Sequence, residues 1–224
     1  MSLLISIHTS KGGQGKSLVS LLLAGALSQP PFNLRVFVAD LDEPQHSLKN
    51  GQNIDLRRYD APAPYQVEKY NYKDFVNALP SLDAYDIVFL DLPGRIDYDR
   101  RPESQEIGLL LSLCNFIFVP FTGGAFNFTA THKYYFWLKQ MEAGRSKVTA
   151  FINQFQPRSI AGKNLLSDLK ATGISPVMVN RLNSFSLFHN DADSYTSFYD
   201  PATTDPAKHN FTLFVNEFVT ILNG

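Results

Sequence analysis

The sequence contains little cysteine and little net charge. Cys114 is the one cysteine among 224 residues, so an internal disulfide is excluded, and its apolar neighbours favour a reducing compartment such as the cytoplasm. No basic stretch leads an apolar segment at the start, and no uninterrupted apolar run is long enough for a membrane span. A formal net charge of −1 excludes a strongly basic nucleic-acid coat protein but allows a local basic patch.

Several catalytic patterns are also missing. The five histidines are scattered, with no pair at helical spacing and no companion cysteines for a zinc site. No Gly-x-Ser-x-Gly elbow of a serine hydrolase is present. The segment after Lys208 has no lysine or arginine, so we expect its helically spaced apolar residues to belong to the core rather than to a basic membrane-binding helix.

Strand-like and helix-like segments alternate along the chain, which predicts parallel β-α-β units. We expect one α/β domain over residues 1–224, with a mostly parallel central sheet and helices on both faces. The expected strands are 3–8, 34–39, 86–90, 116–121, 148–152 and 177–179. The expected helices are 17–28, 72–82, 103–113, 126–143, 161–171 and 207–222. Ligands of such sheets bind beyond the carboxyl ends of the strands.

The most informative segment, residues 10–17, reads Ser-Lys-Gly-Gly-Gln-Gly-Lys-Ser and lies between an apolar run and a helix-like run. Strand, glycine-rich turn and helix start are the context of a phosphate-binding loop. Glycine lets backbone N–H groups approach phosphate oxygens, and the helix start adds unpaired N–H groups. Lys16 is expected to reach the β- and γ-phosphates, and the Ser17 hydroxyl to hold Mg²⁺. Ser10 stands where the standard pattern has glycine, so the match is partial.

The early lysine, Lys11, identifies the subtype, because Lys-Gly-Gly-x-Gly-Lys-Ser resembles the deviant Walker A loop of the ParA/MinD family of ATPases. The resemblance implies a P-loop NTPase fold, a homodimer with ATP between its two copies, and Lys11 contacting the nucleotide of the other copy. It implies catalytic roles for Lys11 and Lys16. The nucleotide-binding residues it implies are Lys11, Gly12, Gly13, Gln14, Gly15, Lys16, Ser17 and Leu18.

Two acidic residues follow the second expected strand. Asp40 and Asp42 are spaced i, i+2, so both are expected to point toward the phosphate site, one orienting Mg²⁺ and one positioning the attacking water. By resemblance, Asp40 is the residue on the Mg²⁺ side and Asp42 the catalytic, water-positioning one. Glu43 is inserted before Pro44-Gln45 relative to the family pattern. The alternative is a pair of solvated acids at a strand end.

Polar residues also end two later strands. Asp91 ends an apolar strand, where a carboxylate is costly unless a cation lies near, so it is expected to hold Mg²⁺ through water as a Walker B aspartate. The following loop, 95–102, is either a second switch or an ordinary solvated loop. Asn153 matches an asparagine that in relatives often lies by the adenine base, and the alternative is a turn residue that ends the strand.

The resemblance covers nearly the whole chain and is weakest beyond residue 155. The chain starts at its first expected strand, so it is similar to the small ParA type, which uses a separate ParB-like adaptor protein. The first hypothesis is a partition ATPase for plasmid or chromosomal DNA, which binds DNA nonspecifically in its ATP state and associates with the nucleoid. The alternatives are a conjugation or cargo-positioning relative, suggested by residues 44–48, and a slowly hydrolysing protein scaffold. The expected basic face comprises Arg145, Lys147, Arg158, Lys163, Lys170 and Arg181.

Overall fold

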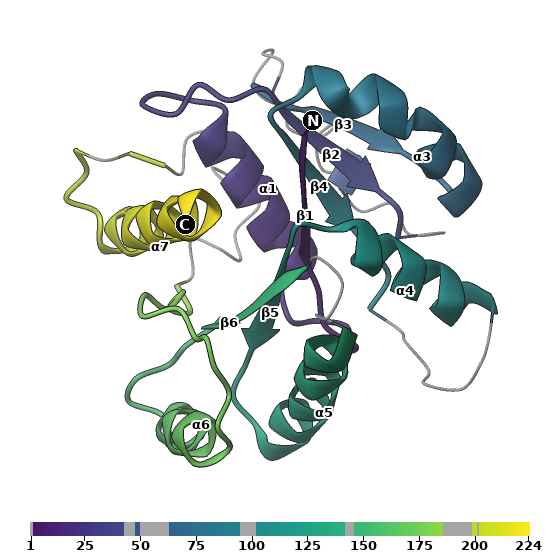
Figure 1. Cartoon of the computed structure of the whole chain (residues 1–224). Coiled ribbons are helices and arrows are strands. Elements are labelled where there is room, and N and C mark those ends of the chain that lie inside the picture. The colour runs from purple at the N-terminus through teal and green to yellow at the C-terminus, as the bar shows by residue number, and fades with distance from the viewer. Residues whose placement is uncertain are drawn as a thin grey trace.

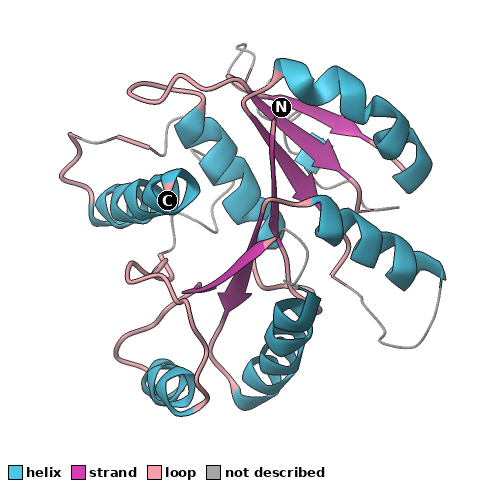
Figure 2. Ribbon diagram, viewed as in Figure 1, coloured by secondary structure: helices cyan, strands magenta, loops and turns pink. Residues whose placement is uncertain are grey.

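The computed structural model describes residues 2–42, 48–49, 63–94, 102–141, 146–185, 199–200 and 202–224. Within these ranges, one six-stranded sheet with the order β3-β2-β4-β1-β5-β6 runs through the molecule, and every pairing is parallel (Figure 2). The strands are β1 Leu3–Ile7, β2 Val36–Asp40, β3 Gln66–Lys69, β4 Ile87–Asp91, β5 Phe116–Phe121 and β6 Lys147–Ile152. The predicted α/β class with a parallel central sheet is confirmed.

Helices cover both faces of this sheet. The helices are α1 Lys16–Leu27, α3 Tyr72–Ala78, α4 Pro102–Leu113, α5 Ala125–Met141, α6 Ile160–Ala171 and α7 Pro206–Asn223. Helices α1 and α7 lie on one side of the sheet, and α3, α4 and α5 lie on the other (Figure 1). Leu165 and Leu169 of α6 belong to the same buried cluster as α4 and α5.

The strands alternate between two cores, which explains their almost continuously apolar sequences. In β4, Ile87 and Phe89 face the core under α1 and α7, whereas Val88 and Leu90 face the opposite core. A strand that is covered on both sides has no solvent-facing residue, so the alternating pattern of half-exposed strands disappears. This burial fixes the strand register, and it places the loops that follow β1, β2 and β4 at one edge of the sheet.

Two expected elements differ from the structure. β3 was not expected, because Val67 is its one fully buried residue and the rest of this edge strand is polar or charged. The predicted strand at 177–179 is wrong: Val177 forms an isolated parallel bridge with Ala150, and Val179 is 81% exposed. The predicted helix at 72–82 ends as an α-helix at Ala78 and continues as the 3₁₀-helix Leu79–Ala84, because Pro80 has no N–H to donate.

Candidate functional site

The loop between β1 and α1 has the conformation that its glycines permit. Gly13 and Gly15 have φ angles of 75° and 76°, in the left-handed region that favours glycine. Gly15 is also the N-cap of α1 and offers no side-chain cap to the helix start. A Cβ added at Gly12 or Gly13 would meet no heavy atom within 4 Å, so open space lies beside this part of the loop. The loop therefore surrounds an open space, and the N-terminus of α1 beside this space favours the binding of an anion there.

The two lysines of the loop lie against the turn that follows β4. The Lys16 side chain is buried, and its Nζ donates to the Lys11 carbonyl oxygen at 3.4 Å. A Cβ added at Gly94 would lie 2.6 Å from Lys16 Nζ and 3.0 Å from the Lys11 carbonyl oxygen. Burial lowers the pKa of Lys16, and the charges of Asp91 and Asp42 partly offset this. The site thus holds the Lys16 ammonium away from bulk water, and the nearby carboxylates offset only part of the cost of burying its charge.

Ser17 and Asp91, each predicted from a separate sequence motif to hold Mg²⁺, meet at the start of α1. The Ser17 Oγ lies 2.8 and 3.0 Å from the two carboxylate oxygens of Asp91. The pKa of Asp91 is raised to about 7, chiefly by burial and also by the nearby charges of Asp40 and Asp42, whereas the Ser17 hydrogen bond and the Lys16 charge act to lower it. A cation beside this buried carboxylate would therefore stabilise its ionised form.

Asp40 and Asp42 lie near the same cluster but differ in environment. Asp40 is opposite Asp91 in the register of β2 and β4 and is fully buried, so the alternative of a solvated acid is wrong for this residue. Its Oδ2 accepts a hydrogen bond from the Lys49 N–H at 3.1 Å. Asp42 lies just after β2, is partly exposed, and acts on the Lys16 ammonium through its charge. Residues 43–47 and 95–101, which include Glu43 and the expected second switch, lie outside the described residues.

Asn153 holds the loop itself, a contact that the sequence did not reveal. Its Nδ2 donates to the Gln14 carbonyl oxygen at 2.8 Å, and its Oδ1 accepts from the Gln154 N–H at 2.9 Å. A Cβ at Gly15 would lie 2.7 Å from Asn153 Nδ2, so the close approach of this amide explains the glycine. A small, mostly apolar pocket adjoins it, lined by Gly15, Leu18, Val19, Leu22, Asn153, Gln154, Leu182, Asn183 and Ser184.

Residues of α5 also contact the loop, and sequence reasoning missed them. Gln14 Nε2 donates to the Thr131 Oγ1 at 3.2 Å, and His8, at the end of β1, contacts Tyr134 of α5. His8, Thr131 and Tyr134 are fully buried. The sequence does carry a signal for His8, and it is the one that identified Asp91, because each is a polar residue that ends an apolar strand.

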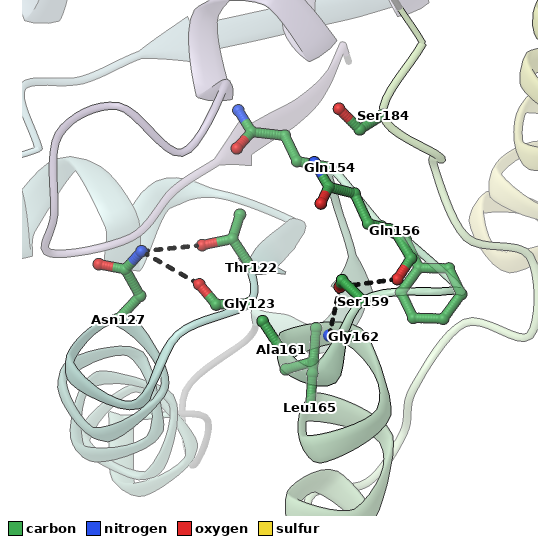
Figure 3. A pocket seen from close by; sticks show the side chains of 11 residues that line it. Thr122, Gly123, Asn127, Gln154, Gln156, Ser159, Ala161, Gly162, Leu165 and Ser184 are labelled. Carbon is green, nitrogen blue, oxygen red and sulfur yellow. Dashed lines mark hydrogen bonds between the residues drawn. The ribbon is translucent and has the colours of Figure 1, made fainter.

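A second cleft, of about 340 Å³, opens beside the loop beyond the carboxyl ends of β5 and β6 (Figure 3). Gln154 lies between this cleft and the loop, with its Nε2 3.5 Å from the Gly13 carbonyl oxygen. The Asn127 amide lies 3.4 Å from both Thr122 Oγ1 and the Gly123 carbonyl oxygen. All of the side chains that line the cleft are uncharged, so it offers hydrogen bonds and apolar contacts without attracting one sign of charge.

The residues of the expected basic face that the structure describes lie at both ends of β6, on α6 and beyond it rather than in one cluster. Lys147 begins β6, with its Nζ 5.4 Å from the centre of the Phe116 ring, whereas Arg158 follows the other end of β6. Lys163 and Lys170 are exposed on α6, two helical turns apart. The Arg181 guanidinium lies 5.0 Å from the centre of the Phe155 ring. Arg145 lies outside the described residues. Lys163 and Lys170 are therefore the pair that shares one exposed helix.

Comparison with known proteins places this site in context. The family model described as the CobQ/CobB/MinD/ParA nucleotide binding domain matches residues 5–198. No curated protein matches the chain. Within the described residues, no helix is long and apolar enough to cross a membrane.

Three solved structures share the fold over nearly their whole length. A plasmid partition protein from Borrelia burgdorferi is 15% identical, with 98% of this chain and 99% of that chain covered and a TM-score of 0.68. Cobyrinic acid a,c-diamide synthase from Mycobacterium smegmatis, with bound ADP and magnesium, is 14% identical, with 100% and 96% covered and a TM-score of 0.72. The cell division ATPase MinD of Pyrococcus furiosus is 16% identical, with 99% and 100% covered and a TM-score of 0.68. At these identities the likeness concerns the fold.

Proposed function

The chain belongs to the CobQ/CobB/MinD/ParA nucleotide-binding domain family, and from this premise we propose that it is an ATPase that binds ATP or ADP with Mg²⁺ at residues 10–18. The observation that carries the proposal is the convergence of Lys16, Ser17 and Asp91 at the start of α1. These three groups come from two motifs that are far apart in the sequence, and each is the residue type that phosphate or Mg²⁺ requires.

The shape of the loop fits a nucleotide. Gly12 and Gly13 leave open space beside the backbone, and the helix N-terminus with the Lys16 ammonium supplies positive charge there. The small pocket beside Gly15 has Leu18 on its wall and the Asn153 amide at its rim, so a base lying against its mouth would meet an apolar side chain and an amide. The similarity to a synthase structure that holds ADP and magnesium supports this assignment.

The oxygen donors beside the loop fit Mg²⁺. Ser17 offers a hydroxyl and Asp91 a carboxylate, with the Asp40 carboxylate nearby, and Mg²⁺ prefers such hard oxygen ligands, often through water. Burial raises the pKa of Asp91, so a cation beside its carboxylate would favour the ionised form. When bound, Mg²⁺ neutralises charge on the phosphate oxygens. Ser17 and Asp91 would hold this ion, and Lys16 would oppose the remaining negative charge.

For hydrolysis, we assign the positioning of the attacking water to Asp42 and contact across a dimer interface to Lys11. Asp42 lies beyond the buried end of β2, partly exposed and close enough to affect the Lys16 pKa. The Lys11 side chain is partly exposed, while its carbonyl faces Lys16 inside the loop. The backbone and the side chain of Lys11 can therefore serve different partners.

A homodimer through the carboxyl edge of the sheet fits the apolar surface there. Phe126 and Ile160, at the starts of α5 and α6, are 87% and 79% exposed. A second copy of the chain that covered these two side chains would remove their apolar surface from water. Both follow strands that end at the same edge as the loop, so one partner surface can cover them and the loop together.

The work that we propose for this ATPase is partition of plasmid or chromosomal DNA. The ATP-bound dimer binds DNA nonspecifically through a face that includes Lys163 and Lys170, and a ParB-like adaptor triggers hydrolysis and release. Similarity to a plasmid partition protein over almost the entire chain supports this choice. The alternatives are a conjugation or cargo-positioning ATPase and a slowly hydrolysing protein scaffold.

Titration calorimetry with Mg·ADP on the wild type, Lys16→Ala and Lys163→Ala tests the assignment of the site. Lys16→Ala should abolish measurable binding, because it removes the charge that opposes the phosphates in a water-poor site. Lys163→Ala, an exposed lysine on α6, is the matched control and should bind as the wild type does. Equal affinity of the wild type and Lys16→Ala would refute the site.

A filter-retention assay with duplex DNA then separates partition from the scaffold alternative. A partition ATPase should retain DNA with Mg·ATP but not with Mg·ADP, and lose it as salt rises. Equal retention with both nucleotides, or no retention at low salt, would favour the scaffold.

A further inference from the structure

His8 joins three elements around the nucleotide loop. It directly follows β1 and is completely buried. Its Nδ1 lies 2.5 Å from the hydroxyl of Tyr134, on α5, and its Nε2 lies 3.0 Å from the carbonyl oxygen of Pro93, in the turn after β4. One imidazole ring therefore connects the start of the loop, the helix α5 and the turn that follows Asp91.

The partners of the ring determine where its proton lies. The Pro93 carbonyl can only accept a hydrogen bond, so Nε2 must carry the hydrogen. Burial, reinforced by the Lys16 charge, lowers the pKa of His8 to about 3, so the ring is neutral and Nδ1 carries no hydrogen. Nδ1 then accepts the hydroxyl hydrogen of Tyr134. Both hydrogen bonds have a fixed direction.

The turn that His8 holds packs directly on the loop. Pro93 precedes Gly94, where an added Cβ would lie 2.6 Å from Lys16 Nζ and 3.0 Å from the Lys11 carbonyl oxygen. A small displacement of the Pro93 carbonyl must therefore move the backbone that contacts both lysines. Helix α5 has a second attachment one turn earlier, where Thr131 accepts a hydrogen bond from Gln14 of the loop at 3.2 Å.

We propose that His8 is a positioning residue of the nucleotide site: held by Tyr134 as the Nε2–H tautomer, it fixes the turn 92–94 and, through that turn, the Lys16 ammonium and the loop at Lys11. Helix α5 and the nucleotide loop consequently take their positions together. The effect on turnover rests on the proposed ATPase function, whereas the tautomer is a property of the protein alone.

Nitrogen–proton correlation spectra of the histidine rings in the full chain test the tautomer without any nucleotide. We expect the His8 ring with its hydrogen on Nε2 and with Nδ1 accepting a hydrogen bond. Tyr134→Phe should shift the Nδ1 resonance toward that of a free acceptor. Tyr135→Phe, which removes the hydroxyl that donates to the Ser175 carbonyl at 2.7 Å, is the matched control on the same helix and should leave it in place. A hydrogen on Nδ1 would overturn the proposal.

Steady-state hydrolysis tests the positioning role. His8→Leu should lower kcat about 10- to 100-fold, because a displacement of about 1 Å in a catalytic site costs that much. The Kd for Mg·ADP should rise by less than kcat falls, because Lys16 keeps its charge in the site and only its position shifts. His8→Gln, which can still donate an amide N–H near the Nε2 position, should recover most of kcat, and Tyr135→Phe should match the wild type.

The outcomes separate the two proposals. A wild type that does not hydrolyse ATP would refute the proposed function, and the tautomer would then decide the inference on His8 by itself. Equal kcat for the wild type, His8→Leu and Tyr134→Phe would overturn the positioning role. If His8→Leu fails to fold, the comparison of Tyr134→Phe with Tyr135→Phe decides between a positioning and a space-filling ring, since each variant loses a single hydroxyl.

Discussion

Burial, more than any single neighbour, sets the chemistry of the two charged groups in the site. Asp91 has its pKa raised to about 7 and Lys16 has its pKa lowered, and in both cases loss of water is the largest cause. Each group therefore prefers a charged partner more strongly than an exposed residue would. Placed at the start of α1, the pair is prepared for a ligand that brings both negative charge and a cation.

Lys11→Ala and Asp42→Ala should separate two steps of the proposed cycle. Lys11→Ala removes the side chain but leaves the carbonyl that accepts from Lys16, so Mg·ADP binding should stay within about threefold of the wild type. It should lose ATP-driven dimerisation and hydrolysis. Asp42→Ala should keep the dimer and slow hydrolysis about 100-fold or more, as expected for loss of a group that positions water.

Light scattering with Mg·ATP reports the dimer, and phosphate release reports turnover. Hydrolysis at the wild-type rate by Lys11→Ala would show that Lys11 does not act across a dimer interface. A monomeric Asp42→Ala protein would remove Asp42 from its assigned role.

His8 should make the folded protein sensitive to acid. Its pKa in the folded protein is about 3, against an ordinary 6.5, so between these values the unfolded chain binds more protons. The free energy of unfolding should therefore fall as pH drops from 6.5 toward 3. His8→Gln removes this titration, so on acidification from about pH 7 to about pH 4.5 the variant should lose about 2 to 3 kcal/mol less stability than the wild type.

Urea unfolding of the nucleotide-free proteins at both pH values measures this difference. Asp91 titrates in the opposite direction, but both proteins retain it, so its contribution cancels in the comparison. Parallel losses of stability in the two proteins would contradict the expected ionisation of His8.

At the scale of elements, the site depends on how the turn after β4 meets the loop after β1. These strands are paired side by side, with Ser6 opposite Leu90, so the segments that follow them emerge next to each other. The hydrogen bonds between Ser17, in α1, and Asp91, at the end of β4, lie at the same junction. The pairing of β1 with β4 thus brings together two motifs that are separated by 74 residues.

Gly94→Ala should disturb this junction. A methyl group there would lie 3.0 Å from the Lys11 carbonyl oxygen, a backbone atom that cannot move without moving the loop, and 2.6 Å from Lys16 Nζ. We expect at least about a tenfold loss of Mg·ADP affinity, equivalent to about 1.4 kcal/mol. Gly108→Ala in α4 is the matched control, because no atom lies within 4 Å of its added Cβ, and it should bind normally.

Calorimetry on both variants gives the comparison directly, with thermal unfolding as the check on folding. Alanine favours a helix over glycine, so Gly108→Ala should be at least as stable as the wild type. Unchanged affinity in Gly94→Ala would mean that the turn after β4 does not restrain the loop.

At the scale of the whole molecule, the carboxyl edge of the sheet gathers the nucleotide loop, the acidic cluster and the exposed Phe126 and Ile160. The exposed lysines of α6 lie beside β6, at one end of the strand order, whereas α3 lies toward the end that carries β3. An exposed lysine of α3 can therefore serve as a control for the lysines of α6, because it lies away from the proposed DNA-binding face.

Lys163→Glu and Lys170→Glu should each weaken ATP-dependent DNA binding without altering Mg·ADP affinity. Each reversal removes a phosphate contact from both copies of a dimer, so we expect about a tenfold loss or more and a shallower salt dependence. Lys73→Glu, an exposed lysine of α3, carries the same charge change and should retain DNA as the wild type does. Equal losses in all three variants would indicate an effect of net charge rather than a binding face.

The sequence by itself determined the features that rest on neighbouring residues. The glycine-rich loop, the start of α1 and the buried strands β4 and β5 were predicted within a residue or two, because backbone freedom and continuous apolar runs are local properties. The α/β class followed from the alternation of these runs. A polar edge strand such as β3 has no comparable local signal, so it was missed.

Only the tertiary structure decided which distant residues complete the site. Asn153 holds the Gln14 carbonyl across 139 residues of sequence, and His8 meets Tyr134 across 126. Burial, which raises the pKa of Asp91 and keeps His8 neutral, likewise depends on helices and strands packed from the whole chain. Val177 shows the converse: its apolar neighbours predicted a strand, but packing leaves it a single bridge to Ala150. Hydrogen bonds and solvent exclusion between remote segments exist only after the sheet has formed, which is why the sequence could not show them.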